Sequence, residues 1–105
     1  MEGGMQLSAS AAQQEVRKLA ATSSNIVWTD HVYEQMDERG IDADDVLAVL
    51  RSGYVDDDPV PGQLPHDWKV QVSLKLKDRR VAVVVAVIQD SKRLILVTAF
   101  WRDGA

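Results

Sequence analysis

Residues 29–53 contain two complete sets of helix start and stop signals, and this feature constrains the fold more than any other. Thr29 is a good N-cap residue, and Gly40 supplies the left-handed residue that ends a helix. Asp42 then caps a second helix that has two further aspartates in its first turn, and Gly53 closes it. The sequence therefore predicts two short helices joined at Gly40.

The second half of the chain has the pattern of a strand meander. Residues 68–77 alternate apolar and polar side chains with a period of two, which indicates a strand with one wet, basic face. Residues 81–88 are apolar throughout and predict a central strand covered on both faces. Residues 94–101 form the last strand, and residues 54–55 start a short one. We expect an α+β domain, with N-terminal helices packed on one face of an antiparallel sheet of three to four strands.

The chain before these elements predicts a disordered start and one weakly packed helix. Residues 1–9 are small and polar, and we expect them to be disordered. A helix begins at Ser10, and its apolar stripe is narrow and rich in alanine. The length of 105 residues fits a single domain over residues 10–105.

Composition excludes several classes of protein. The chain has no cysteine, which excludes disulfides, thiolate metal sites and a cysteine nucleophile. We find neither a signal peptide nor an apolar run long enough for a transmembrane helix, so we expect a cytoplasmic protein that does not enter a membrane.

Charge is distributed unevenly along the chain. Residues 1–67 contain 13 acidic and 4 basic side chains, whereas residues 68–105 contain 3 acidic and 8 basic ones. One interpretation is two solvated faces of opposite sign that attract each other within the domain. The other is a basic sheet face that binds a polyanion.

His31 and Arg39 are the side chains that most suggest chemistry. His31 falls in the first turn of its predicted helix, where the positive end of the helix dipole favours the neutral imidazole that can accept a proton. Arg39 falls in the last turn and could hold a phosphate or stabilise a pentavalent intermediate. Both also have structural interpretations, as a partly exposed histidine bonded to a neighbour and as a cation that caps its own helix.

Two further residues are candidates for contact with phosphate or RNA. Thr98 is the one polar residue of the last strand, and Lys69 lies on the wet face of an earlier strand. An ordinary β-branched strand residue and an ordinary solvated lysine are the alternatives. The two histidines have no ligand spacing of a known kind, so we expect neither a metal nor a cofactor.

The helical pattern and the final strand together resemble domain-of-unknown-function family 4258, a group of small bacterial domains. The resemblance covers about residues 26–101, and its matching residues include His31, Met36, the run Glu38–Ile41, and Leu96–Thr98. It implies the fold of the RelE, barnase and colicin-type ribonucleases, many of which are toxins. His31 would then be the base, Arg39 the transition-state cation and Thr98 a phosphate contact.

The chain departs from this family at one position. Many members carry a histidine at the start of the central strand, where this chain has Ala82. We therefore expect a metal-free endoribonuclease of weak or lost activity, with RNA or an antitoxin-like protein as partner. The alternative is a non-enzymatic interaction or regulatory module, homodimeric through a sheet edge or the first helix.

Overall fold

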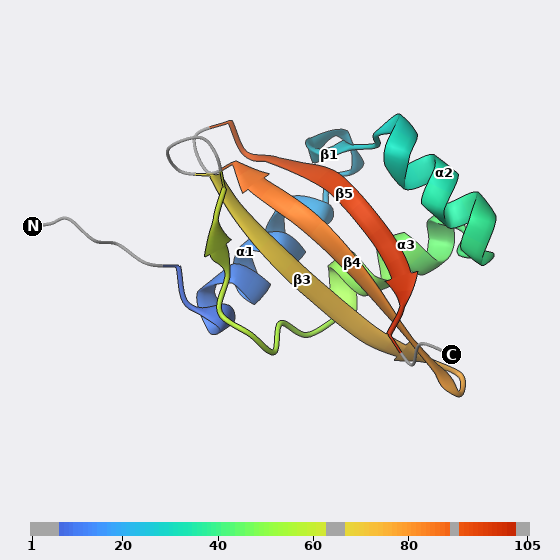
Figure 1. The fold of residues 1–105 in the computed structure, drawn as a ribbon. Helices are drawn as coiled ribbons and strands as arrows, with labels where there is room; N and C mark the ends of the chain where they lie inside the picture. Colours follow the sequence, from blue (N-terminus) through green and yellow to red (C-terminus); the bar gives the residue numbers. More distant parts are fainter. Residues whose placement is uncertain (1–6, 63–66, 89–90, 103–105) are drawn as a thin grey trace, which may run out of the picture.

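Three helices and a five-stranded sheet make up the chain in the computed structural model, which describes residues 7–62, 67–88 and 91–102 (Figure 1). The helices are α1 (Ala9–Ala20), α2 (Asp30–Arg39) and α3 (Ala43–Ser52), with a short 3₁₀ turn, η1 (Ser23–Asn25), after α1. The strands are β1 (Ile26–Val27), β2 (Val60–Pro61), β3 (Asp67–Leu76), β4 (Arg79–Ile88) and β5 (Arg93–Trp101). Their order across the sheet is β1-β5-β4-β3-β2. The structure is therefore of the predicted α+β class.

The sheet differs from the expected three to four antiparallel strands in its number of strands and in one direction. It has five strands, and β1 runs parallel to β5, with Ile26 opposite Leu94. The other pairs are antiparallel, including β2 on β3. Since β1 and β2 have only two residues each, they are too short to show a period-two pattern in the sequence.

The first helix starts earlier than predicted. We expected it to begin at Ser10, but α1 begins at Ala9 with Ser8 as its N-cap. The Ser8 hydroxyl oxygen accepts the backbone N–H of Ala11 at 3.1 Å, which satisfies one of the free donors of the first turn. Residues 1–6, the larger part of the segment predicted to be disordered, lie outside the described residues.

The predicted boundaries of α2 and α3 are confirmed. The Thr29 hydroxyl oxygen accepts the N–H of Val32, and Asp42 forms a reciprocal capping box at the start of α3. Gly40 has φ +67° and ends α2 in the left-handed conformation. Gly53 follows α3 with extended backbone. Local signals alone therefore position the helical hairpin.

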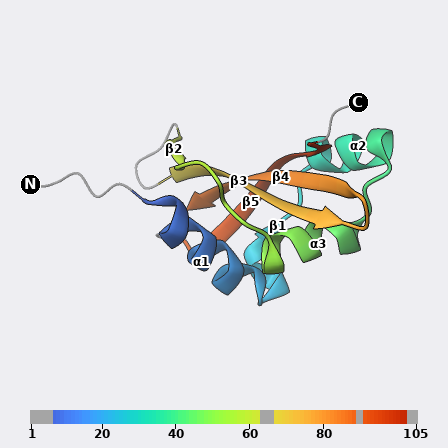
Figure 2. The same cartoon turned by 90° about the horizontal axis from the view of Figure 1, so that it is seen from below.

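The first helix packs tightly, contrary to the expectation of weak packing. Its apolar stripe is in the main core, where Val16 and Ala12 are fully buried. Figure 2 shows α1 and α3 on the same side of the sheet, where they cover the face that Val83 and Val85 of β4 present. Small residues on α1 allow it to approach α3 closely, so a narrow stripe is enough to bury the helix.

Among the described residues, no such helical layer covers the opposite face of the sheet. The strand β4 was expected to be covered on both faces, but Val84, Ala86 and Ile88 are only half-buried. The helices α1 and α3 lie behind the sheet in Figure 1, and α2 lies beside β5 instead. We call this surface the open face; its side chains alternate with those of the core along β3, β4 and β5.

Within the described residues, no helix has the length and apolar character needed to cross a membrane.

Candidate functional site

The helix α2 lies along the outer edge of β5 and is hydrogen-bonded to it at both ends. The Thr29 hydroxyl donates to the carbonyl oxygen of Leu96 at 2.9 Å, and the Arg39 guanidinium donates through Nη1 to the carbonyl oxygen of Ala99 at 2.8 Å. The short strand β1 pairs only with residues 94 and 95 of this edge. The two side chains therefore satisfy edge carbonyls that β1 leaves unpaired, and they fix α2 beside β5.

Thr98 lies between these two attachment points, and a β-bulge decides which way it faces. Leu96 pairs with Val85 and Thr98 pairs with Val84, so Val97 between them has no partner on β4. This extra residue reverses the alternation, because without it Leu96 and Thr98 would share a face. Leu96 is buried in the core, whereas Thr98 is half-buried and belongs to the open face.

His31 and Arg39 share one flank of α2. They lie eight residues apart, about 12 Å along the helix axis, with Gln35 midway between them. His31 and Arg39 are exposed and Gln35 is half-buried. No hydrogen bond to the His31 side chain is present among the described residues. The structure thus brings Arg39 close to the strand segment that holds Thr98, and it places His31 on the same helix, near the attachment at Leu96.

Gln35 was not predicted from the sequence, although a signal for it exists. A polar residue that follows His31 by four positions and precedes Arg39 by four must lie on the same helical flank. Its amide offers two N–H donors and one acceptor oxygen to a ligand bound along α2.

Lys69 is separate from this group. It lies on β3, two strands from β5, and its register partner on β4 is Ala86. The side chain is exposed and belongs to the open face, which it shares with Thr98. The structure therefore does not place Lys69 beside His31 and Arg39, and only a ligand that crosses the sheet could contact all of them.

The joint between α2 and α3 is supported by Trp101. Its indole Nε1 donates to the carbonyl oxygen of Arg39 at 2.6 Å, and the Arg79 guanidinium lies 3.9 Å from its ring centroid. A hollow of about 420 Å³ lies here, lined by Asp42, Asp45, Leu76, Lys77, Asp78, Arg79 and Trp101. None of the predicted site residues lines this hollow. The bond from Trp101 to the Arg39 carbonyl ties the end of α2 to β5.

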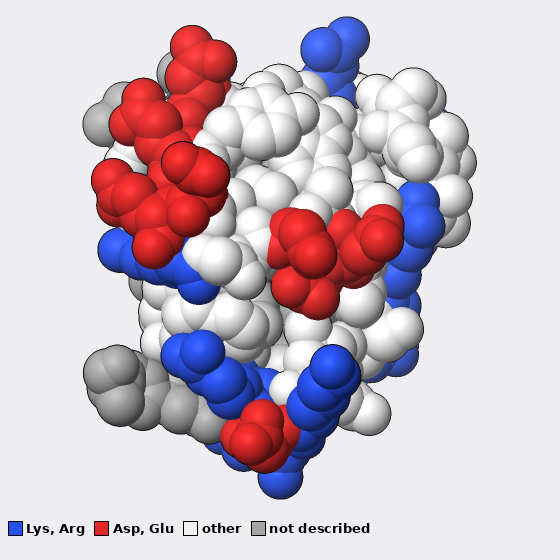
Figure 3. Space-filling view, turned by 90° about the vertical axis from the view of Figure 1, so that its right-hand side faces the viewer, with Lys and Arg blue, Asp and Glu red and all other residues white. Residues whose placement is uncertain are grey.

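The surface over α2 and the start of α3 differs in charge from the surface around the β3–β4 turn. Acidic side chains gather over α2 and the start of α3, and basic ones gather around the β3–β4 turn (Figure 3). A polyanion is repelled by the first surface and attracted to the second. Of these two surfaces, the basic end of the sheet around the β3–β4 turn is the more favourable one for a polyanion.

Metal binding has no support in the described part of the chain. In that part, no three His, Cys, Asp or Glu side chains are grouped as a metal site requires. The expectation that the protein uses no metal remains a prediction.

Comparison with curated proteins and with solved structures found no match. The sequence profile of one family, described as "Domain of unknown function (DUF4258)", matches residues 28–101. The match includes α2, α3 and the three long strands, together with every residue proposed above for the site. The chain therefore belongs to the DUF4258 family.

Proposed function

We propose that this protein is a ribonuclease-toxin-like domain that binds single-stranded RNA on its open face and cleaves it slowly without a metal. The observation that carries the proposal is the attachment of α2 to β5 at Leu96 and Ala99, on either side of Thr98. It supports the proposal because the Arg39 guanidinium is fixed beside the strand segment of Thr98, and His31 lies on the same exposed flank of α2.

In the proposed reaction, His31 accepts the proton of a ribose 2′-hydroxyl, and the 2′-oxygen attacks the adjacent phosphorus. The bond to the 5′-oxygen breaks, and the products are a 2′,3′-cyclic phosphate and a free 5′-hydroxyl. Arg39 stabilises the charge on the pentavalent intermediate. Its guanidinium has five N–H donors, and the bond to Ala99 uses one of them. Thr98 and Lys69 contact phosphates along the open face.

We expect a low cleavage rate. The leaving 5′-oxygen must gain a proton, and a positioned side chain that donates it would speed this step. His31 is the only histidine among the described residues, and Ala82 occupies the position at which many relatives were expected to carry a second one. An alanine cannot donate a proton, so position 82 does not supply the acid half of general acid–base catalysis, and protonation by water is slower.

The test is cleavage of total RNA and of a defined oligonucleotide in the presence of a chelator. We expect His31→Ala to slow cleavage by about 100-fold or more and Arg39→Ala by a similar factor. Asp37→Ala is the matched control, because Asp37 is an exposed residue of the same helix on the side opposite the shared flank. Cleavage that both site variants retain would contradict the assignment and would point to a contaminating nuclease.

The second candidate function is a non-enzymatic interaction or regulatory module. It is favoured by the exposure of Tyr54 and Val60, which are 58% and 55% accessible beside the outer edge of β3. The first helix does not support it, because its apolar stripe is buried within the domain itself. Under this hypothesis the wild-type protein binds no RNA and cleaves none.

A further inference from the structure

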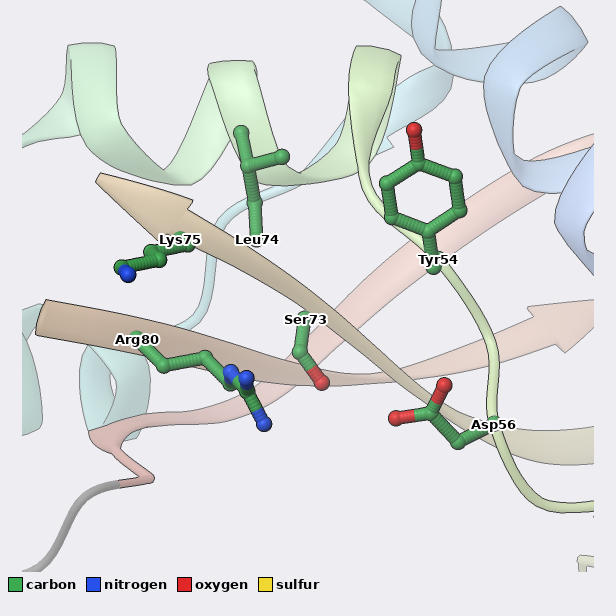
Figure 4. A pocket seen from close by; sticks show the side chains of 6 residues that line it. All are labelled: Tyr54, Asp56, Ser73, Leu74, Lys75 and Arg80. Carbon is green, nitrogen blue, oxygen red and sulfur yellow. The ribbon is translucent and has the colours of Figure 1, made fainter. Parts of the chain in front are cut away.

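A second hollow lies at the opposite edge of the sheet from α2, beside the outer edge of β3 (Figure 4). Its volume is about 330 Å³, and it is lined by Tyr54, Asp56, Ser73, Leu74, Lys75 and Arg80. In Figure 4 the Arg80 guanidinium lies on one side of the Ser73 hydroxyl and the Asp56 carboxylate lies on the other. The hollow thus has a polar floor between a cation and an anion.

The hollow carries more positive than negative charge. Lys75 and Arg80 face each other directly across β3 and β4, and both side chains are exposed. Like charges in directly opposed positions destabilise a sheet, so this pair has an energetic cost that a bound anion would remove. Arg102 adds a third cation, and its Nη1 donates to the Ser73 hydroxyl at 3.0 Å. Among the described residues that line the hollow, Asp56 is the one carboxylate.

Contacts within the protein hold the residues of the hollow in place without a ligand. Tyr54 and Ser73 exchange two backbone hydrogen bonds, of 2.8 and 2.9 Å, which hold the chain after α3 against β3. The Arg17 guanidinium of α1 lies 5.3 Å from the centroid of the Tyr54 ring. Ser73 itself is only 6% exposed, so its hydroxyl is a fixed partner rather than a solvated group.

We propose that this hollow binds a phosphate group. Arg80 and Lys75 supply charged donors from the sheet, and Arg102 supplies a third that is already oriented by Ser73. In the absence of a ligand, Asp56 acts as the internal anion, since its carboxylate pairs with Arg102 at 2.7 Å. The Asp56 side chain is 57% exposed and that of Arg102 is 30% exposed. Solvent therefore weakens the pair on the carboxylate side, and a phosphate can displace the carboxylate.

The proposal does not depend on RNA cleavage. Ser73 and Thr98 both belong to the open face, so the phosphate could be free in solution or part of an RNA backbone that crosses the sheet. These two sources share the same chemistry, and separate titrations distinguish them.

The experiment is an NMR titration of the full chain near neutral pH and at constant ionic strength. One series uses inorganic phosphate and the other uses a short single-stranded RNA that carries 2′-O-methyl groups and cannot be cleaved. We expect saturable shifts at the backbone amides of residues 73–75 and 80. Arg80→Gln should weaken binding by about tenfold or more, because it removes a charged hydrogen bond. Asp56→Asn should strengthen binding severalfold, because it removes the competing carboxylate.

Arg93→Gln is the matched control, since Arg93 is another exposed arginine of the same sheet at the far end of β5. It should leave phosphate affinity unchanged. A response to phosphate alone identifies a free anion as the ligand, and a response to RNA alone identifies a backbone phosphate. The proposal is overturned if neither probe binds, or if Arg93→Gln weakens binding as much as Arg80→Gln. Neither result bears on His31, which the cleavage assay tests separately.

Discussion

Asp45 combines two opposing effects at the start of α3. Its carboxylate accepts the backbone N–H of Asp42 at 3.2 Å and completes the capping box. Partial burial raises the pKa of Asp45 above its usual value, and the neighbouring carboxylates of Asp42 and Asp44 raise it further, whereas the hydrogen bond from the Asp42 backbone lowers it. The capping residue thus holds a proton more readily in the folded protein than in the unfolded chain.

This shift predicts how Asp45 changes stability with pH. Its stabilising contribution is complete below the ordinary carboxyl pKa of about 4 and is lost as the pH rises through the raised pKa of the folded state. Asp45→Asn retains an acceptor oxygen for Asp42 but does not titrate. The free energy of unfolding is measured by urea titration for both proteins from acidic to neutral pH. As the pH rises, it should decrease in the wild type relative to the variant. A difference that stays constant with pH would contradict the assignment.

The attachment of α2 to β5 depends strongly on one hydroxyl group. The Thr29 hydroxyl accepts from Val32 within the helix and donates to Leu96 on the strand, so both bonds require the same atom. Thr29→Val keeps the shape of the side chain and removes both bonds. We expect a loss of about 1–2 kcal/mol in the free energy of unfolding, measured by urea titration. Thr29→Ser keeps both bonds as the control, and equal stabilities of the two variants would show that α2 is held otherwise.

The elements that could be predicted from sequence are those with local signals. Thr29, Gly40 and Asp42 act on their own helix termini, and the alternation of residues 68–76 acts along a single strand. The parallel strand β1 and the edge strand β2 could not be predicted, because their two residues adopt extended backbone only through pairing with distant partners.

The candidate site was predictable only to the extent that it lies on one helix. The eight-residue spacing places His31 and Arg39 on a common flank from sequence alone. The direction that Thr98 faces depends on the bulge at Val97, and the apolar run of β5 gives no sign of this bulge. The contact between Ser73 and Arg102 depends on the register of three strands, which the sequence of none of them specifies.

At the scale of the whole molecule, α1 and α3 cap each other. Arg17 of α1 donates through Nη2 to the carbonyl oxygen of Gly53 at 2.7 Å, beyond the end of α3. Arg51 of α3 donates through Nε to the carbonyl oxygen of Ala20 at 2.9 Å, the last residue of α1. Each helix thus supplies a cation where the other has free carbonyls and the negative end of its dipole. The family match begins at residue 28, yet α1 is joined to the matched region as part of one core.

This joint core predicts that α1 unfolds with the rest of the domain. Val16→Ala removes two methyl groups from a fully buried site and should lower the free energy of unfolding by about 2 kcal/mol, measured in urea by tryptophan fluorescence. The exposed Lys18→Ala is the control on the same helix and should change it by less than about 0.5 kcal/mol. Amide hydrogens of residues 16–20 should exchange as slowly as those of β4, because both need global unfolding. Exchange much faster in α1 than in β4, with Val16→Ala as stable as the wild type, would instead make α1 an independent appendage to the matched domain.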